Sequence, residues 1–123
     1  MFVGANLFLH GFTRILTGVS AWALPEAATF TDTVLPMVLV NATLFMIPYV
    51  QIFLGTCIFL GLFTRWVLLA GLGLFFVLLV GHTARQNWSG AHIVMHYALY
   101  YWILLAALSQ NRLALDNRRA AEP

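Results

Sequence analysis

The stretch that decides the fold runs from Gly81 to Trp102 and has the sequence GHTARQNWSGAHIVMHYALYYW. It holds three of the four histidines, two of the four tryptophans and three of the four tyrosines. A nearly unbroken apolar run leads into it, and a second apolar run leads out of it. This pattern predicts two apolar helices joined by a short polar connection, with polar side chains gathered in the connection and in the first turns of the second helix.

The composition of the chain is that of a protein in lipid. Its 123 residues are 62% hydrophobic and only 8% charged, and their mean hydropathy is +0.88. A soluble domain carries about 25% charged residues, so this chain has too few charges to cover a surface that faces water. All six basic residues are arginines, scattered near the ends of apolar segments without the basic stripe that nucleic acids require. The expected partner is therefore the lipid bilayer and not nucleic acid.

Apolar segments of spanning length predict four membrane helices. Prolines, threonines and acids between residues 24 and 36 interrupt the pattern after the first segment, and Gly61 to Arg65 forms a tight reversal after the second. We therefore expect an all-α fold, an integral membrane four-helix bundle that forms a single transmembrane domain over residues 1–123. Its expected parts are helices at about 3–22, 37–63, 65–82 and 92–110, an outer connector at 24–36 and a tail at 111–123.

One face of the second expected helix combines polar and small residues. The residues of this face are Asn41, Leu44, Pro48, Gln51 and Gly55, which follow one another at spacings of three and four. Such a face is expected to turn toward other helices and not toward lipid. Gly71 and Gly73 in the third helix would likewise let a neighbouring helix come close.

The arginines predict the orientation of the bundle. Those on the side of both termini are Arg65, Arg112, Arg118 and Arg119. The opposite side carries Arg85 together with Glu26 and Asp32. Because arginines are enriched in cytoplasmic loops, we expect both termini in the cytoplasm and the connection from His82 to Ala91 on the outside.

Six polar side chains are expected to form one site, and all of them but His10, which is expected near the middle of the membrane, are expected near its outer surface. They are His10, Arg14, Gln51, His82, His92 and His96. Ionisable groups inside a membrane are functional candidates, because an arginine in hydrocarbon costs at least about 2.5–3.5 kcal/mol. Structural interpretations also exist. Arg14 can snorkel to the surface, and Gln51 can bond the backbone freed by Pro48. His10 can bond a neighbouring carbonyl, and His82 and His92 can lie at headgroup level. The tyrosines and the tryptophan that follow His96 are expected to pack or to form an aromatic belt.

These six side chains suit a quinone headgroup, whose two carbonyls accept hydrogen bonds. Histidine can also relay the proton that accompanies quinone reduction, because its pKa lies near neutrality. Haem b is an alternative, but His92 and His96 on one helix face cannot both be axial ligands, so His10 or His82 would have to supply one. The same pair is a common half-site for zinc or copper, yet no third ligand of clear spacing is visible. Catalytic residues cannot be assigned, since the sequence has no nucleophile elbow, carboxylate pair or phosphate loop.

Three short motifs give the chain a resemblance to a known family. They are FLHGFTR at Phe8–Arg14, the run Gly55–Arg65 that ends in LGLFTR, and NRLALD at Asn111–Asp116. Over nearly its whole length the chain resembles the DoxX/DoxD-like family of small prokaryotic four-helix integral membrane proteins. Gln51 stands where many of these relatives carry an acid in the second helix.

The resemblance implies a multi-pass protein of the prokaryotic cytoplasmic (inner) membrane. Named relatives include the membrane subunit of a thiosulfate:quinone oxidoreductase, and other members accompany redox systems. The resemblance therefore implies a membrane-embedded subunit of a respiratory or other redox complex that interacts with quinone. A haem b-binding electron-transfer subunit and a non-catalytic anchor or assembly subunit remain alternatives. In each case we expect a membrane protein partner or a second copy of the chain.

Overall fold

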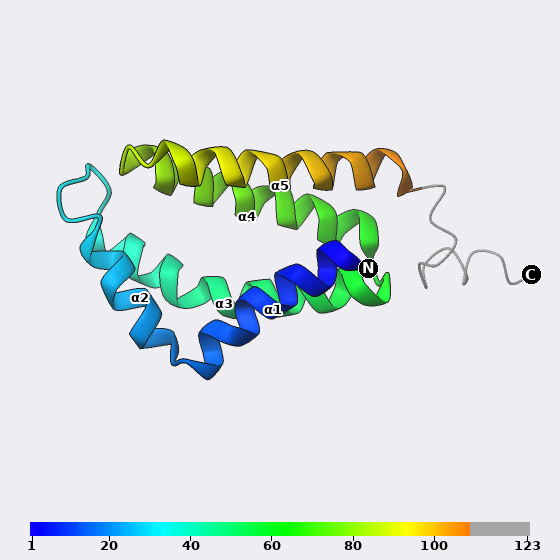
Figure 1. Ribbon diagram of the computed structural model, residues 1–123, viewed down its shortest axis with the longest axis horizontal. Coiled ribbons are helices and arrows are strands. Elements are labelled where there is room, and N and C mark those ends of the chain that lie inside the picture. The colour runs from blue at the N-terminus through cyan, green and yellow to red at the C-terminus, as the bar shows by residue number, and fades with distance from the viewer. Residues whose placement is uncertain (109–123) are drawn as a thin grey trace, which may run out of the picture.

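The computed structural model describes residues 1–108, and within them the chain is all-helical, as expected. The helices are α1 (Phe2–Leu16), α2 (Val19–Ala28), α3 (Met37–Leu60), α4 (Thr64–Ala84) and α5 (Trp88–Ala106). Figure 1 shows that α1 lies along α3 and that α4 lies along α5, so that the helices form two pairs. The N-terminus and the end of α5 lie at the same end of the molecule (Figure 1).

The first expected helix, at 3–22, is broken in the structure. α1 ends at Leu16, and α2 begins at Val19 after Gly18 adopts a φ of 92°. Glycine tolerates this angle because it has no Cβ, so it can redirect the chain in the middle of an apolar segment. Together α1 and α2 run the length of α3 (Figure 1).

The expected outer connector at 24–36 is also shorter than predicted, because α2 continues through Pro25 to Ala28. Three threonine hydroxyls then bond backbone carbonyls around the end of α2: Thr29 to Glu26 at 2.6 Å, Thr31 to Ala28 at 3.0 Å and Thr33 to Phe30 at 2.7 Å. The same carbonyls also accept the backbone N–H groups of these threonines, so the hydroxyls are second donors that favour tight turns over a continued helix, and α2 ends without a glycine.

The remaining helices lie close to their expected positions, with one shift that matters. Gly61 ends α3 in the left-handed conformation, and the Leu62 N–H bonds the Cys57 carbonyl at 2.9 Å, as in a Schellman cap. α5 begins at Trp88 and not at residue 92, because the Asn87 side chain caps it by accepting from the Gly90 N–H at 3.1 Å. The expected end of this helix at 110 and the tail at 111–123 lie outside the described residues.

Glycines bring α1 and α3 into direct backbone contact. A Cβ added to Gly55 would lie 2.5 Å from the Phe8 nitrogen, and one added to Gly11 would lie 2.5 Å from the Pro48 carbonyl oxygen. Small residues at such contacts are typical of helices that associate in lipid. The face predicted for α3 is confirmed in its burial: its buried members are Leu44, Pro48, Gln51 and Gly55, and Asn41 is half-buried.

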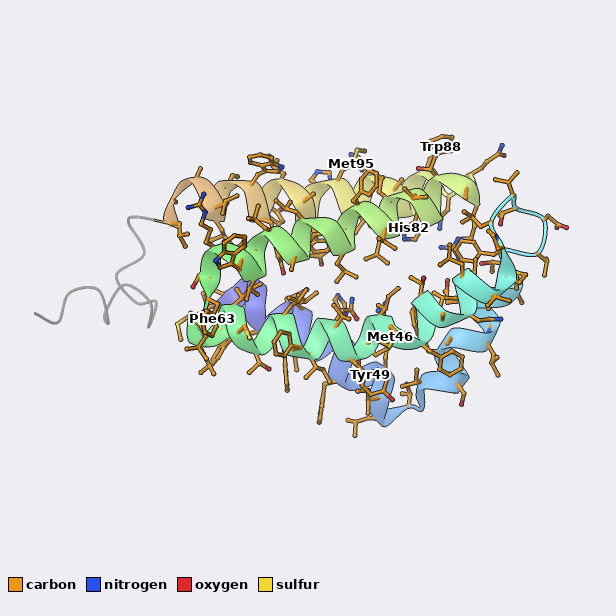
Figure 2. The ribbon with its side chains drawn as sticks, turned by 180° about the vertical axis from the view of Figure 1, so that it is seen from behind. Met46, Tyr49, Phe63, His82, Trp88 and Met95 are labelled. Atoms are coloured by element: carbon orange, nitrogen blue, oxygen red, sulfur yellow. The ribbon has the colours of Figure 1, made fainter. Side chains whose placement is uncertain are left out.

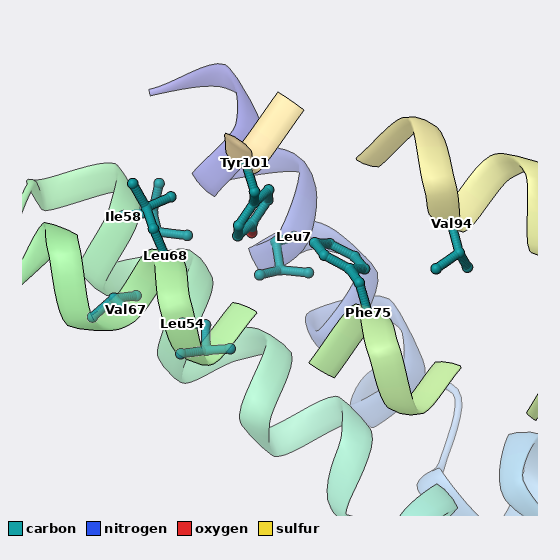
Figure 3. Packing of buried hydrophobic residues seen from close by; sticks show 8 residues of the cluster. All are labelled: Leu7, Leu54, Ile58, Val67, Leu68, Phe75, Val94 and Tyr101. Atoms are coloured by element: carbon teal, nitrogen blue, oxygen red, sulfur yellow. The ribbon is translucent and has the colours of Figure 1, made fainter. Parts of the chain in front are cut away.

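The two glycines expected to admit a neighbour in α4 behave differently. Gly71 lies against the ring of Tyr101 from α5, so the expectation holds there. A Cβ added to Gly73 would meet no neighbouring atom within 4 Å, so no helix among residues 1–108 approaches it and the expectation is wrong at that position. Tyr101 also meets Phe75 edge to face, with ring centroids 4.8 Å apart. Figure 3 shows both rings beside Leu7 of α1 in the apolar core.

The outer surface of the described residues is strongly apolar. Phe53 of α3, Phe76 of α4 and Trp102 of α5 are 65%, 67% and 61% exposed. Figure 2 shows Trp88 and Met95 on the outer side of α5. Among residues 1–108, α3 and α4 are the two helices long and apolar enough to cross a membrane.

Candidate functional site

A cavity of about 640 Å³ lies between the two helix pairs, and residues of all five helices line it. Its size falls within the roughly 300–1,000 Å³ of typical ligand sites. The walls are mostly apolar, with Leu44 and Ile47 from α3, Phe75 and Leu78 from α4, and Val94 from α5. Polar side chains from several helices are set into these apolar walls, which is the usual construction of a small-molecule site.

The wall formed by α1 carries a polar stripe. Asn6, His10 and Arg14 line the cavity at successive turns of the helix. A guanidinium nitrogen (Nη1) of Arg14 donates to Oε1 of Gln51 at 2.7 Å, and the guanidinium lies 4.1 Å from the ring centre of Trp22. Gln51 is only 4% exposed. Arg14 therefore does not snorkel to a surface, and Gln51 is engaged with a side chain on another helix.

One end of the cavity is formed by a cluster around Arg85, just after α4. Its Nη1 donates to Glu26 Oε2 at 2.8 Å and to Thr29 Oγ1 at 2.8 Å. Its Nη2 lies 3.0 Å from Nδ1 of His82. The guanidinium also lies 4.7 Å from the ring centre of Phe30. This cluster, the Arg85 cluster, fastens the segment around α2 to the end of α4.

Tyr101 brings an unused hydroxyl to the cavity wall. The residue is 0% exposed and lines the cavity. Its hydroxyl has no hydrogen-bond partner among residues 1–108. A buried polar group without a partner costs about 1–3 kcal/mol, so native proteins keep few of them. The Tyr101 hydroxyl is therefore an unpaired donor in the wall of the cavity, buried just behind its surface.

His92 and His96 lie outside the cavity. Both are exposed, their rings meet edge to face at a centroid distance of 4.4 Å, and Nδ1 of His96 lies 2.9 Å from the His92 carbonyl oxygen. The predicted convergence of six side chains is therefore wrong for these two. His10, Arg14, Gln51 and His82 do line one cavity. His92 and His96 lie outside the cavity because α5 turns its other face toward the bundle. Its buried residues are Ala91, Val94 and Tyr101, so positions 92 and 96 lie on the opposite face.

Sequence reasoning does not identify Tyr101, Arg85 and Glu26 as members of the site. The predicted topology does place Arg85 and Glu26 on the same side of the membrane. This shared side is the one feature of the sequence that indicates a contact between them. The position of Tyr101 in the sequence does not show whether its hydroxyl has a partner, because the surroundings of the ring depend on how α4 and α5 pack.

No protein-family model, no curated protein and no solved structure matches the chain. Within residues 1–108, no group of three or more histidine, cysteine, aspartate or glutamate side chains could hold a metal ion.

Proposed function

We propose that the chain is a multi-pass protein of the prokaryotic cytoplasmic membrane with four spans and with both termini in the cytoplasm. The first span is the broken helix formed by α1 and α2, and the others are α3, α4 and α5. The apolar outer surface and the glycine contacts between α1 and α3 support this proposal. A broken span is acceptable in lipid where it borders a cavity, and the break at Gly18 lies between the cavity-lining residues Arg14 and Trp22.

Within this membrane protein, the cavity binds the ring of a quinone, and the chain serves as the quinone-binding subunit of a redox complex. The observation that carries the proposal is an apolar cavity whose wall holds the Arg14–Gln51 pair and, buried just behind the surface, the unpartnered Tyr101 hydroxyl, which a quinone carbonyl reaches by a small local displacement. A quinone offers two carbonyl acceptors on an apolar ring, so it needs donors of this kind within apolar walls. When bound, the quinone supplies electron transfer, while this chain holds the ring.

His10 is the side chain placed to move a proton at this site. It lines the cavity one turn from Arg14, so its ring borders the space in which a quinone would be held. Its ring makes no hydrogen bond with another residue of 1–108, which leaves both nitrogens available. Histidine exchanges protons near neutral pH, which is what a group that delivers protons to a bound quinone must do.

The direct test is to purify the full chain from its native membrane, extract it with solvent and identify bound quinone by mass spectrometry. Wild-type protein should retain quinone, and Tyr101→Phe should retain several-fold less, because the ring stays while the donor is lost. Tyr100→Phe is the matched control, since Tyr100 is exposed and lies outside the cavity lining. A quinone-free wild-type extract, or equal retention in the two variants, contradicts the proposal.

Haem b is the second candidate, because His10 and His82 line one cavity from different helices. These two imidazoles are the pair in the described residues that could ligate an iron across the cavity. A visible spectrum of the same purified sample decides the question. A Soret band that disappears in His10→Ala supports haem, and a spectrum without the band removes it. If both quinone and haem are absent and the partner complex keeps its activity, the chain is an anchor or assembly subunit.

A further inference from the structure

α5 carries two stripes with alternating spacings of three and four on opposite faces. The inner stripe faces the rest of the bundle and contains Ala91, Val94, Ala98, Tyr101 and Leu105. The outer stripe contains Ser89, His92, His96, Leu99, Ile103 and Ala106, and all six residues are exposed. This spacing is that of the a and d positions of a coiled-coil seam, where two helices meet along their length.

The outer stripe has hydrogen-bonding groups that the bundle does not satisfy. Nδ1 of His96 bonds the His92 carbonyl oxygen, which can only accept, so the proton lies on Nδ1 and Nε2 of His96 is an acceptor. The ring of His92 contacts the ring of His96 but makes no hydrogen bond within residues 1–108. His96 lies about 12 Å along the helix from Trp88, at 1.5 Å per residue. If α5 spans the membrane, these nitrogens face hydrocarbon, where unpaired polar groups are costly.

We propose that two copies of this chain associate in the membrane through the outer stripe, with α5 against α5. The inference rests on the membrane location in the proposed function and extends beyond it. A two-fold axis perpendicular to the membrane places the two α5 helices parallel, so each seam residue lies beside its own counterpart and diagonally across from the next seam residue of the partner. The small residues Ser89 and Ala106 let the two backbones approach at both ends of the seam.

Hydrogen-bond complementarity argues for a second copy as the occupant of this face. Each copy offers an acceptor, Nε2 of His96, and a donor, the ring N–H of neutral His92. Under two-fold symmetry, His92 of each copy can donate to the partner's His96, so the same contact forms twice. Leu99 and Ile103 continue the seam with the aliphatic layers that coiled coils use. The stripe is therefore complementary to itself in shape and in hydrogen bonding.

Cysteine cross-linking in native membranes tests the arrangement of the two copies. Cys57 is the single cysteine of the chain, so Cys57→Ala provides a background without thiols. On this background, Leu99→Cys should form a disulfide-linked dimer on mild oxidation, because a parallel seam brings the two positions 99 together. Leu69→Cys is the matched control, since Leu69 is an exposed leucine of α4 outside the stripe. Absence of a Leu99→Cys dimer, or equal cross-linking of the control, overturns the proposal.

The role of the imidazoles is tested by the strength of association of labelled full-length chains in liposomes. His96→Leu should weaken dimerisation about 3- to 20-fold, the range for one or two hydrogen bonds between membrane helices. His10→Leu is the control, because His10 lies in the cavity. Quinone retention should be unchanged in His96→Leu, which separates a failure of the dimer from a failure of the quinone site. Dimerisation that is unaffected in His96→Leu overturns the complementarity on which the proposal stands.

Discussion

Arg14 shows how a single residue can hold a charge inside an apolar bundle. Its partners are the neutral amide of Gln51 at 2.7 Å and the face of Trp22 at 4.1 Å. A carboxylate at position 51 would neutralise the guanidinium, whereas the amide orients it and leaves its charge in place. The guanidinium of Arg14 therefore keeps its positive charge at the cavity wall, where it favours a carbonyl dipole or an anionic oxygen on a bound molecule.

The buried hydroxyl of Tyr101 should contribute nothing to the stability of the ligand-free protein. In the ligand-free protein, Tyr101→Phe should leave the free energy of unfolding unchanged or raise it by up to about 1 kcal/mol, because the lost hydroxyl has no partner. Tyr101→Ala should lower it by about 3–5 kcal/mol, since the ring fills the contact with Gly71 and Phe75. Unfolding in mixed micelles of increasing denaturing detergent measures both. A clear loss of stability in Tyr101→Phe would mean that the hydroxyl has a partner in the folded chain.

At this scale, residue type and depth predict part of the site. Four polar side chains lie in apolar segments: His10, Arg14, Gln51 and His82. The free-energy cost of placing such groups in hydrocarbon is enough to make them candidates. The prediction is wrong at His92 and His96 because a spacing of four shows only that two residues share a helix face. It does not show whether that face turns toward the bundle or away from it. That choice depends on the partner helix, which is set by packing across the whole of α5.

At the scale of elements, the contact between α1 and α3 can be tested with two glycines. Gly55→Ala should destabilise the protein by about 1–3 kcal/mol, because the new methyl group would meet the backbone of Phe8. Gly73→Ala makes the same chemical change in α4 where nothing lies within 4 Å. It should stabilise the protein by about 0.5–1 kcal/mol through helix propensity. The same detergent titration gives both values, and equal effects of the two substitutions would contradict the close contact.

Element boundaries are predictable where a residue forces them and not elsewhere. Gly61 ends α3 three residues before the expected end at 63, where the expected reversal begins, because glycine after an apolar run is a strong helix stop. The break at Gly18 is not predicted, since the apolar pattern continues on both sides and a helix interior also tolerates glycine. The early start of α5 is not predicted either, because Asn87 lies in a polar stretch that resembles a loop, although asparagine is a good N-cap.

At the scale of the whole molecule, two helix pairs are held together at opposite ends. The turn from Gly61 to Phe63 joins α3 to α4 at one end, and the Arg85 cluster joins the segment around α2 to the end of α4 at the other. Between these ends the pairs touch much less than the helices within each pair. The cavity lies in this intervening region.

Loss of the Arg85 cluster should therefore loosen one end of the molecule. Arg85→Ala removes the partner of Glu26 and of Thr29, and should destabilise the protein by about 1–2 kcal/mol, a range that allows for the partial exposure of Glu26. Amide hydrogen exchange measured by mass spectrometry should accelerate in α2 and remain unchanged in the middle of α3. Arg65→Ala is the control, because Arg65 is exposed at the other end. Unchanged exchange in α2 would show that the cluster does not fasten it.

The close glycine contact between α1 and α3 has a consequence for biosynthesis. The proposed first span is broken at Gly18, and α1, its longer part, has 15 residues and contains Asn6, His10 and Arg14. A helix that crosses a bilayer by itself needs about 20 mostly apolar residues without a break. We therefore expect the translocon to release the N-terminal segment into lipid only after α3 has been synthesised, so that the two helices integrate as a hairpin. Reporter fusions after residues 28 and 60 would reveal this order, with the longer fusion alone resistant to alkaline extraction. On this expectation, the N-terminal segment becomes anchored only when α3 is available to pair with it.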